Sequence, residues 1–333
     1  MVSDADQDQL KTYKTTVNFV VVPVTVKDGD GRQVAGLLQG DFAIYENGEP
    51  QQIRFFTSDA FPLSAAVVVD LSQPDSSLRK VNSGLSALQG AFSQYDEIAF
   101  FTYGNSVQRV LDFNAIGDRT SAAIAQIKRQ QGRTSADMGG GPMAAGPTVN
   151  GRAVDPSKQA GIDVPIIPHE PHVLNDAILA AANDLMHRPL SRRKVILVIS
   201  DGREERSNAS YSDVLKVLLS NEITVYAIAV DSAAIPVLNR IDRLHLPRLG
   251  YSNILPKYAS ATGGDVFSEF SRDAIERSYQ IASEEARNQY TLGYSTRATL
   301  ADNYRTIEVR VKRPNLKVFA KDGYYPLPPP RKP

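Results

Sequence analysis

Between residues 64 and 285, short apolar runs alternate with longer segments of helical periodicity, and this order constrains the fold more than any other feature. Such alternation is typical of a parallel sheet that helices cover on both faces. The apolar runs predict strands at 64–71, 97–102, 107–113, 194–200, 223–230 and 265–268. The helical patterns predict helices near 76–92, 119–130, 174–187, 212–219 and 274–285. We therefore expect an α/β domain with a doubly wound, mostly parallel sheet.

Both ends of the chain have the pattern of additional β structure. Val- and Thr-rich or alternating runs, separated by turn residues, predict strands at 15–26, 42–45, 52–56, 289–294, 304–312 and 316–320. Neither end has enough strands to bury both faces of a sheet alone. We therefore expect the two ends to pair in one small β-sandwich-like lobe, with the α/β domain inserted between them.

These patterns also predict where each segment begins and ends. The expected order is a flexible segment at 1–13, a β segment at 14–60, the α/β domain at 61–286, a second β segment at 287–325 and a Pro-rich tail at 326–333. Within the α/β domain, 131–171 is a Gly- and Pro-rich insertion without convincing periodicity. Its part at 131–164 has few large apolar side chains, so we expect it to be mobile.

Charge and hydropathy exclude several classes of protein. The 37 basic residues balance the 37 acidic ones, so no overall field attracts nucleic acid or an anionic membrane. No apolar run approaches the roughly 18 to 20 residues that cross a bilayer, so we expect a soluble chain. Charges on the C-terminal strands predict a solvated sheet face, formed by Arg305, Arg310, Lys312, Arg313, Lys317 and Lys321.

Two further features concern the compartment and the chemistry. Cysteine is absent, which excludes disulfides, thiolate nucleophiles and Cys-based metal sites but permits export. Residues 1–9 are polar, with neither a charged nor an apolar signal region, so any signal peptide has been removed or never existed.

Carboxylates follow two of the predicted strands. Asp70 and Ser72 come at the end of the strand at 64–71, and Asp201 follows the strand at 194–200. Because α/β proteins bind ligands at the carboxyl edge of the sheet, we expect these side chains to converge there. Two carboxylates and a hydroxyl would form a hard-oxygen site suited to Mg²⁺, Mn²⁺ or Ca²⁺.

At these residues the chain resembles the von Willebrand factor A (vWA) superfamily. Its metal-ion-dependent adhesion site (MIDAS) uses a D-x-S-x-S loop, a Thr before a later helix and an Asp after another strand. Asp70, Ser72 and Asp201 stand at three of these positions. The flanking segments VTVKDGDGRQVAGLLQGDFAIYENGEPQQIRFF, QYTLGYS and YRTIEVRVKRPNLKVFAKDGYYP are similar to a vWA-related family recurrent in acidobacterial genomes. The resemblance spans nearly the whole chain.

Two positions depart from the MIDAS pattern, so the resemblance implies a degenerate site. Pro74 stands at the third loop position and has no hydroxyl. The segment HVLNDAI is similar to the family's T-x-L-x-D-A-I helix start, and it places His172 where a coordinating Thr is expected. Imidazole suits Zn²⁺, Ni²⁺ or Mn²⁺ better than Mg²⁺. The site has therefore changed its metal, lost metal altogether, or recruited Asp75, Ser76 or Ser77 as a compensating ligand.

Each of these residues also has an interpretation without a metal. Ser72 and Asp75 have the spacing of a capping box, and Asp201 with the following Gly forms a common turn pair. Asp176 is expected to cap or decorate the first turn of its own helix. If Asp70 and Asp201 do converge, a cation, the imidazolium of His172 or helix N–H groups must compensate their charges.

A hydrolytic site has less support. The segment His169-Glu170-Pro171-His172 contains two histidines, but H-E-x-x-H chemistry needs them one turn apart on a helix, and Pro171 disrupts that geometry. Single tyrosines near strand ends, such as Tyr103 and Tyr258, are expected to be half-buried packing residues.

The leading hypothesis is therefore a non-enzymatic protein-binding module for adhesion or assembly, either periplasmic or secreted. Its top face, formed by Asp70, Ser72, His172 and Asp201, would capture a protein partner, and the resemblance implies that an Asp or Glu of that partner would complete a metal's shell. Two alternatives stay open: a metal-free structural protein of the cell envelope, and a transition-metal hydrolase that uses His169, His172 and Asp201.

Overall fold

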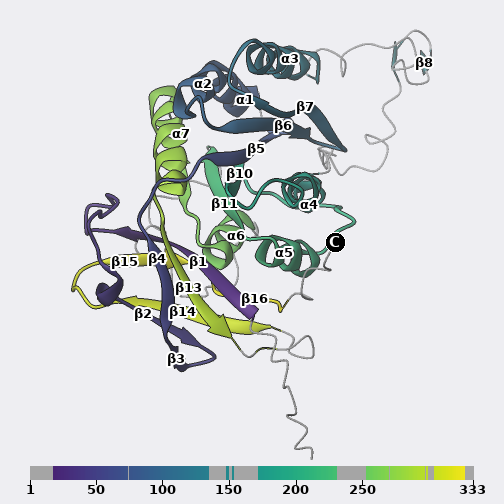
Figure 1. Ribbon diagram of the computed structural model, residues 1–333. Helices are drawn as coiled ribbons and strands as arrows, with labels where there is room; N and C mark the ends of the chain where they lie inside the picture. Colours follow the sequence, from purple (N-terminus) through teal and green to yellow (C-terminus); the bar gives the residue numbers. More distant parts are fainter. Residues whose placement is uncertain are drawn as a thin grey trace, which may run out of the picture.

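The computed structural model describes residues 18–73, 75–134, 148–149, 152–153, 172–230, 253–269, 271–296, 298 and 304–326. Within these residues, an α/β domain and a β lobe pack against each other (Figure 1). No helix among the described residues is long and apolar enough to cross a membrane.

A six-stranded sheet forms the centre of the α/β domain, in the order β12-β11-β10-β5-β6-β7. Its strands are β5 (Leu63–Asp70), β6 (Glu97–Tyr103), β7 (Val107–Ala115), β10 (Arg193–Ser200), β11 (Ile223–Val230) and β12 (Val266–Glu269). All neighbouring strands are parallel except β6 and β7, which are antiparallel. This order confirms the predicted doubly wound, mostly parallel α/β fold.

Helices cover both faces of this sheet (Figure 1). One face packs against α1 (Asp75–Gly84), η2 (Leu85–Ala87), α2 (Leu88–Ala91), α3 (Asp118–Thr134) and α7 (Arg272–Arg287). The other packs against α4 (Leu174–Leu185), α5 (Tyr211–Ser220) and α6 (Leu255–Thr262). Strand β5 is buried on both faces, because Val67 contacts the first helical layer and Val68 the second. This explains its continuous apolar sequence.

Two helical segments differ from the predictions. The single helix expected at 76–92 is interrupted, because the chain tightens into the 3₁₀ turn η2 after Gly84. A Cβ at Gly84 would lie 3.4 Å from Ile275 of α7, so the chain packs directly against α7 at this point. Helix α6 was not predicted, since it is short and largely buried.

The β lobe consists of two four-stranded sheets, ordered β15-β1-β13-β4 and β16-β14-β2-β3. The first contains β1 (Asn18–Lys27), β4 (Ile53–Thr57), β13 (Tyr290–Thr296) and β15 (Lys317–Ala320). The second contains β2 (Phe42–Glu46), β3 (Glu49–Gln51), β14 (Arg305–Val311) and β16 (Gly323–Tyr324), and η1 (Gln39–Asp41) precedes β2. Strands from both ends of the chain share one apolar core, as predicted. The residue limits of the two lobes stay a proposal.

The predicted solvated basic face is wrong for one residue. Lys321 is only 5% exposed, and it lies where the β lobe meets the α/β domain. The alternation of charges could not reveal this, since the burial comes from the second domain.

Three predicted segments lie wholly or mainly outside the described residues. These are 1–13, most of the tail at 326–333 and most of the insertion at 131–171. Within the insertion, α3 extends to Thr134, and β8 (Thr148–Val149) pairs with β9 (Arg152–Ala153). The expected mobility of 131–164 stays a prediction.

Candidate metal centre

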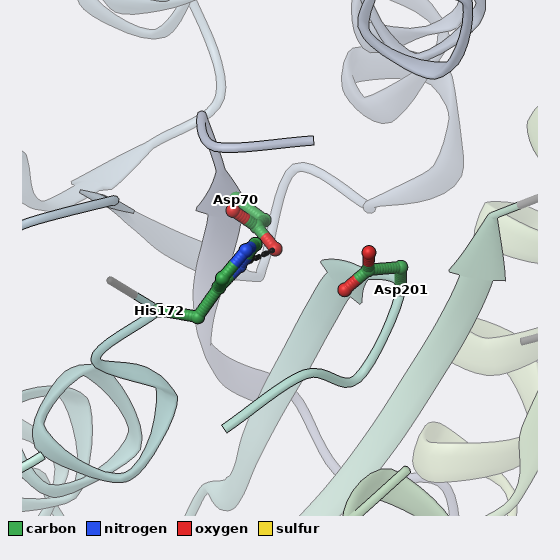
Figure 2. Close-up of side chains that lie close together, drawn as sticks. All are labelled: Asp70, His172 and Asp201. Carbon is green, nitrogen blue, oxygen red and sulfur yellow. Dashed lines mark ion pairs between the residues drawn. The ribbon is translucent and has the colours of Figure 1, made fainter. Parts of the chain in front are cut away.

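Three elements bring Asp70, His172 and Asp201 to the carboxyl edge of the sheet. Asp70 is the last residue of β5, and Asp201 follows the neighbouring parallel strand β10. His172 precedes α4, where its carbonyl accepts a hydrogen bond from Glu205 N at 2.8 Å. One ligand atom from each of the three side chains lies within 4.8 Å of the other two. Figure 2 shows the imidazole against Asp70, with the Asp201 carboxylate on the neighbouring loop.

The carboxylate of Asp70 is fully buried and held by hydroxyl and backbone donors. Its Oδ1 accepts from Ser72 N at 2.9 Å and from Ser72 Oγ at 2.7 Å. Its Oδ2 accepts from Ser200 Oγ at 2.9 Å and from the hydroxyl of Tyr103 at 3.0 Å. Burial and the nearby Asp70 keep the pKa of Tyr103 well above its ordinary value, so this phenol stays a donor. Asp70 therefore has a fixed orientation.

The hydrogen bonds between Ser72 and its two partners define where the protons lie. The ionised carboxylate of Asp70 can only accept, so the single hydroxyl hydrogen of Ser72 points to Asp70. Ser72 Oγ then accepts from His172 Nδ1, 3.0 Å away, and Nδ1 must carry a hydrogen. A serine nucleophile needs the opposite direction, in which histidine takes the hydroxyl proton. This arrangement therefore does not support nucleophilic catalysis by Ser72.

His172 is enclosed by opposite charges. Its Nδ1 lies 3.7 Å from Asp70 Oδ2, and the side chain is 5% exposed. The Asp70 carboxylate beside the imidazole raises the pKa of His172, which outweighs the lowering caused by burial, and Asp201 adds to the rise. A proton and a metal ion would therefore compete for this imidazole, since only the neutral ring can bind a metal.

Asp201 offers a second buried carboxylate with a less complete set of partners. Its Oδ1 accepts from Arg203 N at 3.0 Å. Its Oδ2 has no hydrogen bond, although Arg203 Nε lies 3.1 Å away as an ion pair. Burial raises the pKa of Asp201, and the neighbouring Asp70 contributes in the same direction. Because this oxygen accepts no hydrogen bond, a cation could bind to it.

The loop after Asp201 is tied to the start of α4. Glu204 accepts from Asn175 N at 2.7 Å and from Ser207 N at 3.1 Å. Asp176 accepts from Asn208 N at 3.0 Å and from Ala209 N at 2.8 Å. Asp176 thus lies in the first turn of α4, as expected, but its carboxylate caps the facing loop rather than its own helix.

The remaining predicted ligands are only partly described. Pro74, His169 and the side chains of Asp75 and Ser76 lie outside the described residues, so their roles as ligands stay predictions. The side chain of Ser77 is buried.

Sequence reasoning did not assign Ser200 or Arg203 to the site, and it treated Tyr103 as half-buried packing. Tyr103 is instead 1% exposed and hydrogen-bonded to Asp70. Tyr103 ends β6 and pairs in register with Asp70 at the end of β5. Its position at the carboxyl end of the neighbouring strand was the sequence signal that could have identified it. Tyr258, likewise expected to be half-buried, is fully buried, and its hydroxyl donates to Asn175 Oδ1 at 2.7 Å.

The donor set fits a divalent ion of intermediate softness. Two carboxylates and one imidazole are within reach of a common point, and Asp201 supplies an oxygen without a hydrogen bond. This combination suits Zn²⁺ or Mn²⁺ better than Mg²⁺, which prefers an all-oxygen octahedral shell. Asp70, His172 and Asp201 would hold such an ion.

Residues 162–249 match the family model described as the von Willebrand factor type A domain. This segment of the chain is similar to that family. No curated protein matches the chain.

Among solved structures, the chain resembles a von Willebrand factor type A protein from Catenulispora acidiphila, with 12% identity and a TM-score of 0.46 over 85% of this chain and 70% of that one. It also resembles the conserved hypothetical protein BatB from Bacteroides thetaiotaomicron, with 15% identity and a TM-score of 0.40 over 67% and 98%. A third is proximal thread matrix protein 1 from the mussel byssus with a zinc-occupied MIDAS motif, at 12% identity and a TM-score of 0.40 over 70% and 49%.

Proposed function

We propose that this protein is a binding module that captures a protein partner at the top face of its vWA domain, with a divalent metal ion at the centre of the contact. The observation that carries the proposal is the convergence of Asp70, His172 and Asp201 at one edge of the sheet. vWA domains are typically interaction modules rather than enzymes, and the proton positions around Ser72 agree with this role.

The site's own residues prepare it for capture. Tyr103 and Ser200 fix Asp70 from beneath, so the carboxylate cannot turn away from the edge. When bound, the metal would supply a positive centre with an open position for a carboxylate of the partner. An Asp or Glu side chain of the partner is the matching ligand.

His172 decides which metal is preferred. It replaces a hydroxyl ligand by an imidazole, which favours Zn²⁺ and other later divalent metals over Mg²⁺ and Ca²⁺. Because the pKa of His172 is raised, metal binding should weaken as the pH falls and the ring takes up its second proton.

A metal-free assembly protein is the second candidate, and one observation favours it. His172 lies 3.7 Å from Asp70, and Arg203 lies 3.1 Å from Asp201, so two side-chain cations already face the two carboxylates. In that case the same face would bind its partner without an ion, and chelators would have no effect.

We further propose that the protein acts in the cell envelope or outside the cell and belongs to the vWA-related family recurrent in acidobacterial genomes. The β lobe built from both ends of the chain would then hold the vWA top face away from its attachment point. Fractionation of the native host, followed by detection of the protein in periplasm or medium, tests this location. A purely cytoplasmic signal would contradict it.

The decisive experiment measures metal directly. Protein purified without added metal is analysed for its elements, and thermal unfolding is then recorded with EDTA and with Zn²⁺, Mn²⁺ or Mg²⁺. We expect a saturable stabilisation by Zn²⁺ or Mn²⁺ that Asp201→Ala abolishes and that the exposed control Asp30→Ala retains. No metal-dependent shift in the wild type would favour the metal-free candidate.

A double variant tests whether these positions form one site. His172→Thr together with Pro74→Ser returns both hydroxyls of the MIDAS pattern, so a Mg²⁺-dependent thermal shift should appear. A well-folded double variant that responds to neither Mg²⁺ nor Mn²⁺ would contradict the assignment of Asp70, Ser72, residue 172 and Asp201 to a common metal site. Formation of a complex between this protein and a partner from a cell-envelope extract then tests capture. EDTA should prevent this complex from forming.

A further inference from the structure

A pocket lies at the edge of the central sheet opposite to the candidate metal centre, where the strands β10 and β11 begin and the β lobe packs against them. It has a volume of about 70 Å³. Val21 and Pro23 of β1 form its wall on the β-lobe side, and Phe61 and the largely exposed Leu190 line it from the α/β domain. The pocket therefore has apolar walls contributed by both lobes.

Its charged lining is dominated by cations. Arg192, Arg193 and Lys194 line the pocket, and Glu222 is the carboxylate among its lining residues. Arg192 already has a partner, because its Nε lies 3.4 Å from Glu97. Lys194 is close enough to Glu222 for that carboxylate to raise its pKa, although burial lowers it more.

Among the three cations that line the pocket, Arg193 is the one for which the described residues provide no carboxylate partner. It donates to the carbonyl of Gln289 and to Thr291 Oγ1, and its guanidinium lies 4.9 Å from the centre of the Phe61 ring. All three partners are neutral. Its Nε is buried without a hydrogen-bond partner. Burial lowers the pKa of Arg193 to about 10, and no described carboxylate offsets this, yet the group stays protonated at neutral pH.

A buried charge in a folded protein is normally paired, because leaving it unpaired is costly. Here the unpaired guanidinium lines an accessible pocket, so an anion from outside can supply the missing charge. We propose that this pocket binds a short aliphatic carboxylate, with its charge on Arg193 and its alkyl part against Val21, Pro23 and Leu190.

Charge and the apolar walls select this chemical class. Three cations line the pocket against the single lining carboxylate Glu222, so an anion is attracted, and the apolar walls would leave the outer oxygens of sulfate or phosphate without donors. The apolar side chains of Val21, Pro23 and Leu190 suit a short alkyl group beside the ligand's carboxylate. The carboxylate can be a free acid, an acidic side chain of a peptide, or a peptide's C-terminus, since all three present the same group.

Saturation-transfer NMR with propionate tests the proposal directly. The measurements use full-length protein carrying Asp201→Ala and include EDTA, so that the top-face site cannot bind the ligand. We expect transfer to the propionate methyl group, none to the neutral isostere propionamide, and at least tenfold weaker binding in Arg193→Gln. Arg193→Lys should be intermediate, because it keeps the charge but loses the planar fork. The exposed control Arg277→Gln should bind like the parent.

Several outcomes would overturn this site. They are equal binding of propionate and propionamide, undiminished binding in a folded Arg193→Gln variant, and competition by sulfate as strong as that by acetate. If the site is present, two peptides are tested as competitors of propionate: a blocked peptide with one Glu and a peptide with a free C-terminus. Competition by either one identifies a peptide as the source of the carboxylate. Competition by neither identifies a free acid. Metal binding at the top face does not enter any of these readouts.

Discussion

Glu285→Gln should remove a large part of the protein's pH dependence of stability. Glu285 of α7 lies in a buried cluster at the junction of the two lobes, where Lys27 Nζ contacts Glu285 at 2.5 Å and Asp265 at 2.6 Å. Phe267 and Phe319 lie against the ammonium group at 5.5 and 5.1 Å. One cation thus faces two carboxylates.

The magnitude follows from the pKa of Glu285. Burial raises it from 4.5 to about 7, outweighing the attraction of Lys27, and Asp265 adds to the rise. Burial alone would lower the pKa of Lys27, but the two carboxylates raise it, so the lysine stays charged. At about 1.4 kcal/mol per pKa unit, the shift of Glu285 corresponds to about 3 kcal/mol.

The stability changes with pH in the direction expected for an acid whose pKa is higher in the folded than in the unfolded state. The folded state binds the extra proton between pH 4.5 and about 7, so the stability that protonated Glu285 contributes is fully present below pH 4.5. It is lost as the pH rises through about 7. Between roughly pH 4.5 and 8, the free energy of unfolding should therefore fall by up to about 3 kcal/mol more in the wild type than in Glu285→Gln.

Urea unfolding at closely spaced pH values, followed by circular dichroism, measures this difference. Glu284→Gln is the matched control, because this neighbouring side chain is exposed and should leave the wild-type pH dependence unchanged. Parallel pH profiles for wild type and Glu285→Gln would refute the reasoning, since they would mean that Glu285 has the same pKa in the folded and unfolded chains.

Three further predictions concern the top face and the β lobe. Arg203→Gln should raise the affinity for Zn²⁺ about tenfold in a chelator-competition assay, because the guanidinium no longer pairs with Asp201. Asp176→Ala should lower the free energy of unfolding by about 1–2 kcal/mol and speed amide exchange at 208–209, since these N–H groups lose their acceptor. Deleting 289–333 should expose 18–57 to protease, because it removes β13 from between β1 and β4.

Each of these has a contrary outcome. Unchanged or weaker Zn²⁺ binding in Arg203→Gln would show that the arginine does not compete with the ion. Unaltered exchange at 208–209 in Asp176→Ala would mean that another acceptor holds the loop. Protease resistance of 18–57 equal to that of the intact chain would show that these strands fold without their C-terminal partners.

The sequence by itself predicted which segments form the strands of the α/β domain and two of the three charged residues at its edge. Periodicity is a local property, so alternating apolar runs identified β5 and β10 and placed Asp70 and Asp201 at their carboxyl ends. Identification of His172 needed a resemblance to a known motif, because no local pattern marks a residue before a helix as a ligand.

Only the tertiary structure determined which side chains surround these residues and how the two lobes meet. Tyr103 reaches Asp70 because β6 pairs with β5 in one register, and Asp176 caps a loop about thirty residues away. Arg193 is left without a counter-ion because the β lobe covers it with neutral groups. Such contacts depend on segments distant in sequence, whereas propensity and periodicity describe only neighbours along the chain.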